Sequence, residues 1–242
     1  MNKVMVITGG TSGIGKYLTK KFSEKDYVYV FSKDIEKIEA AKKDINNDNV
    51  SFINCDITNE NEIKNAFETI KNNHDHIDIL INNAAYDSRD TIENYDYVEF
   101  EKIIKTNLIG KSFCIKHAVP FLKKSKYPSI INIASRLANV PMDSSSAYCC
   151  AAAAIVMLTK CSALELEKYL IRVNCISPSL TITPLSLKSY DKNEMDNVLS
   201  KSTRNRLCEP QDIYSLICFL ISKKADYING ENIGINGGVL LK

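Results

Sequence analysis

The sequence predicts an α/β fold in which a doubly wound parallel sheet of about seven strands carries helices on both faces. Short apolar runs recur along the 242 residues, and helix-length amphipathic segments separate them in regular alternation. The apolar runs are rich in β-branched residues and alternate only weakly with polar ones, which is typical of strands covered on both faces. Strands and helices in strict alternation form right-handed βαβ units, so the strands should run parallel.

Seven runs are expected to be strands: VMVI (4–7), VYVF (28–31), VSFIN (50–54), IDILI (77–81), SIINIA (129–134), RVNCI (172–176) and NIGI (232–235). Between them, residues 34–45 and 59–73 have the pattern of amphipathic helices, and Asp34 is the expected N-cap of the first. No repeat, low-complexity linker or change of composition interrupts the chain, so we predict one domain over residues 1–242. The polar segment 179–208 follows the sixth strand, where an insertion of this length is typical of a substrate lid.

The composition and net charge argue against several classes of function and partner. A hydrophobic share of 45% and a charged share of 25% are ordinary for a globular domain with a full core. The net charge of +2 gives no reason to expect nucleic acid or an anionic membrane as a partner. No apolar run approaches the roughly 18 residues that span a bilayer, and Met1 leads into a strand pattern rather than a signal peptide. The eight cysteines lack metal-ligand spacing, so we expect no metal site and a reduced, cytoplasmic location.

The stretch TGGTSGIG (8–15) joins the first expected strand to the first helix. Gly9, Gly13 and Gly15 allow a tight turn, a close approach of the backbone to a ligand, and close contact between helix and strand. The free N–H groups at the start of the helix would then face a pyrophosphate. A glycine-rich loop alone is often a simple turn, but this one lies at the strand-to-helix junction that phosphate binding requires.

That loop and the motifs that follow it resemble the short-chain dehydrogenase/reductase family over nearly the whole chain. In the family's order they are TGGTSGIG, Asp56 after the third strand, NNAA (82–85), Asn107 in KTNLIG, Ser135 in NIAS, Tyr148, RVNCISPS (172–179) and NGENIGINGG (229–238). The resemblance implies a Rossmann-type sheet that binds NAD or NADP. It also implies reversible hydride transfer between the carbonyl and the secondary alcohol of a small molecule.

By this resemblance, Tyr148 protonates the carbonyl oxygen, Ser135 orients that oxygen, and Asn107 holds a water of the proton relay. A free phenol has a pKa near ~10 and ionises too little at neutral pH, so it needs a nearby cation. In the family the cation is a lysine four residues after the tyrosine, one helical turn away on the same face. Here that position is Ala152.

Ala152 has three interpretations. In the one we favour, the natural residue is lysine, which was replaced deliberately to stop turnover; restoring it gives YCCAKAAI, a complete motif. In the second, the natural protein lacks the lysine and is a cofactor-binding or regulatory pseudoenzyme. In the third, another basic group substitutes, but Lys160 lies three helical turns or about 18 Å from Tyr148, which is too far. We therefore expect an NAD(P)(H)-dependent oxidoreductase that Ala152 strongly impairs.

The resemblance also implies a set of cofactor contacts: Gly9, Thr11, Ser12, Gly13, Ile14, Gly15, Ser32, Lys33, Asp56, Ile57, Asn83, Ala84, Tyr148, Pro178, Thr181 and Thr183. Ser32 stands where NAD-preferring relatives carry an acid, and Lys33 suits a 2′-phosphate, so we favour NADP(H) over NAD(H). Ala85 and Ser179 each replace a glycine that the family usually has.

The expected helices around 97–124 and 146–169 are apolar over more than one face, which is more than one sheet face can cover. By resemblance they form a four-helix interface, so we expect a homo-oligomer, a tetramer or a dimer. Arg89, Arg136 and Arg204 lie near pocket-lining segments. We favour their interpretation as surface arginines over contacts to an anionic or polyhydroxylated substrate. The lid sequence does not identify the substrate.

Overall fold

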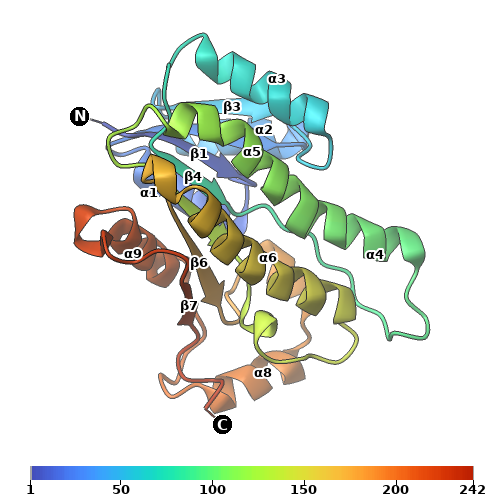
Figure 1. The fold of residues 1–242 in the computed structure, drawn as a ribbon. Coiled ribbons are helices and arrows are strands. Elements are labelled where there is room, and N and C mark those ends of the chain that lie inside the picture. The colour runs from blue at the N-terminus through green and yellow to red at the C-terminus, as the bar shows by residue number, and fades with distance from the viewer. Residues whose placement is uncertain (1, 242) are drawn as a thin grey trace.

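The computed structural model describes residues 2–241, and its centre is a seven-stranded sheet in the order β3-β2-β1-β4-β5-β6-β7 (Figure 1). Every neighbouring pair of strands is parallel. The strands are β1 (Val4–Thr8), β2 (Tyr27–Ser32), β3 (Val50–Asn54), β4 (Ile79–Asn82), β5 (Ser129–Ile133), β6 (Arg172–Pro178) and β7 (Asn232–Ile235). All seven expected strands are present, and the predicted fold class is confirmed.

The α-helices are α1 (Gly13–Phe22), α2 (Ile35–Ile45), α3 (Glu60–Lys71), α4 (Tyr97–Ile104), α5 (Lys111–Leu122), α6 (Ser146–Glu165), α7 (Pro184–Ser189), α8 (Lys192–Lys201) and α9 (Pro210–Leu220). Short helical turns are η1 (Lys105–Gly110), η2 (Arg136–Ala138), η3 (Glu167–Tyr169) and η4 (Lys223–Ala225). The two helices predicted over 34–45 and 59–73 are α2 and α3. Asp34 accepts a hydrogen bond from the Lys37 N–H at 3.0 Å and caps α2 as predicted.

Two apolar cores lie on opposite faces of the sheet, because successive strand side chains point to opposite sides. Val4 and Val6 of β1 belong to the core packed against α3 and α5. Met5 and Ile7 of the same strand belong to the core packed against α1 and α9. All five residues of β1 are buried, which explains the weak alternation of its sequence.

The helix expected over 97–124 is not continuous. Residues Lys105–Gly110 form a π-helical turn, η1, between α4 and α5. A π-turn inserts an extra residue and changes which side chains face the neighbouring elements, and such turns are frequent at functional sites. A Cβ on Gly110 would lie 2.5 Å from the Ile57 carbonyl oxygen, so this close approach requires glycine. The turn therefore sets the positions of Asn107, which lies within it, and of Lys111, which follows it directly.

Helix α6 corrects one sequence expectation. In the described part of the chain it is the one helix long and apolar enough, by length and composition, to cross a membrane. It packs against β6 and η1 within this fold. We therefore interpret its apolar character as that of a packed helix.

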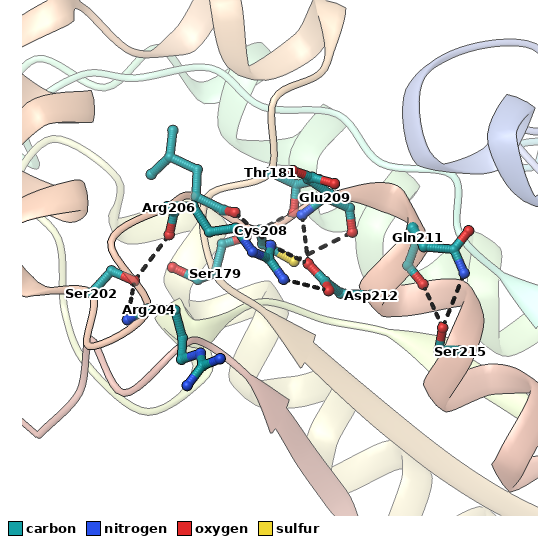
Figure 2. A network of polar contacts seen from close by, with 11 residues as sticks. Ser179, Thr181, Ser202, Arg204, Arg206, Cys208, Glu209, Gln211, Asp212 and Ser215 are labelled. Carbon is teal, nitrogen blue, oxygen red and sulfur yellow. Dashed lines mark hydrogen bonds and ion pairs between the residues drawn. The ribbon is translucent and has the colours of Figure 1, made fainter.

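The expected lid, residues 179–208, leaves and returns to the sheet at neighbouring points. Thr181 and Cys208 form a parallel bridge, and the Cys208 N–H donates to the Leu180 carbonyl at 3.2 Å. Figure 2 shows the adjoining network, in which both terminal nitrogens of Arg206 bond the Asp212 carboxylate at 2.7 and 2.8 Å. Between these ends the segment contains α7 and α8, and α8 lies beyond the carboxyl ends of β6 and β7 (Figure 1).

Candidate active site

A cavity of about 340 Å³ opens at the carboxyl ends of the strands. It brings together every residue that the sequence assigned to the site. The four proposed catalytic positions line it, namely Asn107, Ser135, Tyr148 and Ala152. The proposed cofactor contacts line it as well: Gly9, Thr11, Ser12, Gly13, Ile14, Gly15, Ser32, Lys33, Asp56, Ile57, Asn83, Ala84, Pro178, Thr181 and Thr183. Parallel strands place their carboxyl ends at one edge, which is why residues so distant in sequence meet there.

The glycine loop has the close approaches that a phosphate cradle needs. A Cβ on Gly15 would lie 2.2 Å from the Gly9 carbonyl oxygen, and a Cβ on Gly9 would lie 2.8 Å from the Ala84 Cα. Gly9 also adopts a φ of +67°, a left-handed conformation that glycine tolerates best. The N-cap of α1, Ser12, makes no side-chain capping bond, so the first N–H groups of this helix are available to a ligand. These features fit a pyrophosphate.

At the adenosine end, the Ser32 and Thr11 hydroxyls share a hydrogen bond of 3.0 Å. Lys33 Nζ lies 3.3 Å from Asp56 Oδ2, and 56% of the Lys33 side chain is exposed. Burial acts to raise the pKa of Asp56, but hydrogen bonds from Thr58 and the Lys33 charge outweigh it and lower that pKa. Lys33 is thus a solvent-accessible cation at the mouth of the cavity.

Asn83 joins β4 to the glycine loop, because its side chain donates to the carbonyls of Thr8 at 2.9 Å and Gly9 at 3.2 Å. The Thr8 hydroxyl in turn accepts from the N–H groups of Asn83 and Ala84, each at 3.0 Å. Sequence reasoning missed Thr8, which lies at the end of the first strand. Thr183 lies against the glycine loop, because a Cβ on Gly13 would be 3.2 Å from the Thr183 Cβ. Thr183 also caps α7 and accepts from the Ser186 N–H at 3.2 Å.

Tyr148 lies in the first turn of α6, and Ser135 is the N-cap of the turn η2 that faces it. Burial raises the pKa of Tyr148, and the charges of Asp87 and Tyr190 act in the same direction. A hydrogen bond with Ser135 acts to lower it. The raised pKa keeps Tyr148 a neutral proton donor at neutral pH, and a poor base.

The Asn107 side chain is held at both ends by one peptide segment. Its Oδ1 accepts from the Tyr86 N–H at 2.8 Å, and its Nδ2 donates to the Tyr86 carbonyl at 2.8 Å. Both ends of the Asn107 amide are therefore bonded to the backbone of Tyr86, and its role in holding a water stays a prediction. The two bonds anchor the loop that follows β4 to the turn η1.

Comparison with known proteins identifies the family. A sequence model described as "Enoyl-(Acyl carrier protein) reductase" matches residues 9–240. Secoisolariciresinol dehydrogenase of Forsythia intermedia is 33% identical over 98% of this chain and 88% of its own length. The chain belongs to the short-chain dehydrogenase/reductase family.

Solved structures of the family agree with this assignment. The 3-ketoacyl-(acyl-carrier-protein) reductase of Brucella melitensis, complexed with NADH, has a TM-score of 0.90 and 28% identity, with 98% of each chain covered. The protein ElxO with NADP bound has a TM-score of 0.91 and 29% identity, with both chains covered completely. This short-chain dehydrogenase/reductase therefore has the family fold from end to end.

Sequence reasoning missed several residues that line the cavity of this family member, and one of them is Lys111. Only 3% of this residue is exposed, and its Nζ donates to the Ile133 carbonyl at 2.7 Å. Burial lowers its pKa to about 8. Its position four residues after Asn107, one helical turn in an α-helix, is the signal that could have found it.

Another missed residue is Asp87, two positions after the NNAA motif. It lines the cavity, and within residues 2–241 its Oδ1 has no hydrogen-bond partner. Burial raises the pKa of this carboxyl group. An acceptor with a free lone pair in the cavity suits a substrate that carries a hydroxyl group.

The three arginines have different positions. Arg136 lines the cavity. Arg89 pairs with Glu194 of α8 at 2.8 Å and lies 4.8 Å from the Tyr190 ring, so it ties the segment 179–208 to the loop after β4. Arg204 borders a second, smaller cavity between the segment 179–208 and the residues that follow β7. Among residues 2–241, no group of three potential His, Cys, Asp or Glu metal ligands is close enough to hold a metal ion.

Proposed function

We propose that this chain is an NAD(P)(H)-dependent oxidoreductase that interconverts a carbonyl and a secondary alcohol of a small molecule. One observation carries the proposal: the Tyr148–Ser135 pair and the glycine loop of α1 open into the same cavity. A hydroxyl pair alone would suit many reactions. Its combination with a dinucleotide site at the carboxyl edge of a parallel sheet is specific to hydride transfer.

When bound, the nicotinamide supplies or accepts the hydride. The residues of the chain would bind and orient the substrate and would transfer one proton. Ser135 donates a hydrogen bond to the substrate oxygen and fixes its position, and Tyr148 gives that oxygen its proton as the carbonyl is reduced. In the oxidative direction, the phenolate of Tyr148 takes the proton from the alcohol.

We infer a preference for NADP(H). Lys33 supports it, because it is an accessible cation beside the predicted adenosine site, and Ser32 offers no carboxylate to a ribose hydroxyl. One related structure contains NADH and another NADP, so the family accommodates both. Calorimetric titration with each cofactor should give the lower dissociation constant for NADP(H). Equal affinities, or tighter NAD(H) binding, would contradict the preference.

Ala152 should impair this activity. It lines the cavity with 6% of its surface exposed, and it offers Tyr148 no charge. We infer that Ala152→Lys raises turnover, because an ammonium one turn from the phenol stabilises phenolate. Reading codon 152 in the unmodified gene tests whether lysine was replaced deliberately. The raised pKa of Tyr148 favours the alternative, a protein that binds the cofactor without catalysis.

The test is a turnover screen with NADPH and NADH against sugars, steroids, acyl thioesters and small ketones. The chain and its Ala152→Lys variant are both assayed, and Tyr148→Phe serves as the matched inactive control for each. Oxidation of the cofactor that requires Tyr148 supports the proposal. Cofactor binding without turnover in a folded Ala152→Lys variant would favour the non-catalytic alternative.

We also infer a homo-oligomer, a tetramer or a dimer, with a cytoplasmic location and neither nucleic acid nor membrane as a partner. Exposed apolar side chains on the outer helices support the assembly: Val98 of α4, Met157 and Leu164 of α6 are 63%, 58% and 70% exposed. Such a surface is costly unless a partner covers it. A monomeric mass at micromolar concentration in light scattering would contradict the assembly.

A further inference from the structure

Asp87 has a buried carboxyl oxygen that the fold leaves without a hydrogen bond. The residue lines the cavity, and in the described part of the chain its Oδ1 has no partner. The nearest cation along the loop, Arg89, pairs instead with Glu194 at 2.8 Å and also donates to the Ser189 carbonyl. A buried acceptor without a donor costs free energy, which an apolar side chain would avoid. Neither packing nor an ion pair with Arg89 therefore explains this carboxyl group.

The loop that carries Asp87 is attached to the start of α6 on both sides of this residue. Before it, Tyr86 packs against the same small apolar core as Tyr148. After it, Arg89 Nε donates at 3.4 Å to the hydroxyl of Ser145, the N-cap of α6. These two attachments hold Asp87 beside the first turn of the helix that contains Tyr148.

The charge of Asp87 acts on the side chains of that first turn. Burial raises the pKa of Tyr148 and of its neighbour Cys149, and the charge of Asp87 acts in the same direction on both. Such an effect decreases with distance. The carboxyl group therefore lies near the place where Tyr148 and Ser135 would hold the substrate oxygen.

Arg136 brings the opposite charge to the same end of the cavity. It follows Ser135 directly and lines the cavity. Burial raises the pKa of Tyr190 and of Cys149. The charge of Arg136 opposes burial in both groups, whereas the charge of Asp87 adds to it.

These two charges favour a neutral polar substrate. A substrate with an ammonium group would be repelled by Arg136, and one with a carboxylate would be repelled by Asp87. A hydroxyl group meets neither repulsion, because it can donate to a carboxylate and accept from a guanidinium.

We propose that Asp87 selects a hydroxylated substrate, namely a ketone with a hydroxyl group on the first or second carbon beside the carbonyl, or the corresponding diol. The inference rests on the proposed function and names its substrate class. The reacting oxygen binds Tyr148 and Ser135, and the other hydroxyl donates to Asp87 Oδ1. That hydroxyl keeps its proton and all its bonds. Only the carbonyl is reduced, by hydride at its carbon and the Tyr148 proton at its oxygen.

The experiment compares methyl ketones that differ in one group: acetone, hydroxyacetone, aminoacetone and pyruvate. Oxidation of the reduced cofactor is followed in the unaltered chain and in Ala152→Lys. Hydroxyacetone should exceed acetone in kcat/KM by about 10–100-fold, because a hydrogen bond to a charged acceptor is stronger than one to a neutral acceptor. Aminoacetone and pyruvate should have no such advantage. The pair 4-hydroxybutan-2-one and butan-2-one tests a hydroxyl on the second carbon in the same way.

Asp87→Ala in both backgrounds should lower the ratio of hydroxyketone to ketone by about 10-fold or more, and Asp87→Asn, which keeps an acceptor, by less. The ratio isolates recognition of the hydroxyl, since any effect of the Asp87 charge on Tyr148 is common to both ketones and cancels. Asp90→Ala is the matched control. Asp90 belongs to the same loop, accepts from the Thr91 N–H at 2.8 Å and does not line the cavity.

Ratios that Asp87→Ala leaves unchanged in both ketone pairs would overturn the inference. A preference for aminoacetone over hydroxyacetone that Asp87→Ala removes would overturn it as well, because it would assign Asp87 to an ammonium group.

A binding measurement separates this inference from the proposed function. If no variant oxidises the cofactor, the proposed function fails. Saturation-transfer NMR on the chain loaded with the reduced cofactor then compares propane-1,2-diol with propan-2-ol, and no reaction can occur. The diol should bind about 10-fold more tightly, and Asp87→Ala should remove that difference. Equal binding of the two alcohols to the unaltered chain would contradict a role of Asp87 in recognising the hydroxyl.

Discussion

The buried ammonium of Lys111 should make the stability of the chain depend on pH. Burial lowers the pKa of its ammonium from 10.5 to about 8 in the folded chain. Between these values the unfolded chain holds a proton that the folded chain has released, so stability rises with pH across this window. Lys111→Met removes this dependence, because methionine has a similar length and no proton to exchange.

The size of this change in unfolding free energy follows from the size of the pKa shift of Lys111. One pKa unit corresponds to ~1.4 kcal/mol, so between pH ~8 and pH ~9.5 the unaltered chain should gain about 2 kcal/mol relative to Lys111→Met. The variant also leaves the Ile133 carbonyl without its donor. That loss costs about 1–3 kcal/mol at every pH. The difference in unfolding free energy between the two proteins at a single pH therefore has no diagnostic value. Only the change of that difference with pH reports on the Lys111 proton.

The assay is urea unfolding of both proteins at pH ~7.5 and pH ~9.5, with equal m-values as the condition for comparison. Tyrosines and cysteines that ionise in this range are common to both proteins, so they cancel in the difference. A difference in unfolding free energy that stays constant within about 0.5 kcal/mol would refute the reasoning, since it would mean that Lys111 ionises alike in the folded and unfolded chain.

Three further perturbations test the site. Lys33→Ala should weaken NADP(H) binding about 5–30-fold in calorimetry and leave NAD(H) unchanged, because only the 2′-phosphate uses that exposed charge; equal losses would contradict the assignment. Gly15→Ala should cost about 1–3 kcal/mol in urea unfolding and abolish cofactor binding, because its Cβ would lie 2.2 Å from the Gly9 carbonyl oxygen. Asp87→Asn should lower the pKa of Tyr148 by up to about 1 unit, since it removes a negative charge that disfavours phenolate. Phenolate absorbance at alkaline pH, with the spectrum of Tyr148→Phe subtracted, measures this change, and an unchanged titration would show that Asp87 is already neutral.

The sequence by itself determined the order of strands and helices, and the site residues that it predicted all line one cavity. Strand and helix patterns depend on neighbours within a few residues, as does the capping of α2 by Asp34, so the local sequence contains them. Parallel strands bring their carboxyl ends to one edge, so motifs that follow strand ends, such as the glycine loop and Ser135, meet there. A lid at 179–208 was predicted because this polar segment interrupts the alternation of strands and helices directly after the carboxyl end of a strand.

Only the tertiary structure decided which side chains act together inside that cavity. The π-turn η1 interrupts a segment whose sequence predicts a continuous helix, and it determines that Asn107 bonds to Tyr86. The burial of Lys111, and with it the low pKa, arises from β5, β6 and α5, which are distant in sequence. A local pattern could show that lysine is absent at position 152. It could not show that another helix brings a lysine into the same cavity, because side-chain direction and dielectric environment are set by packing between elements.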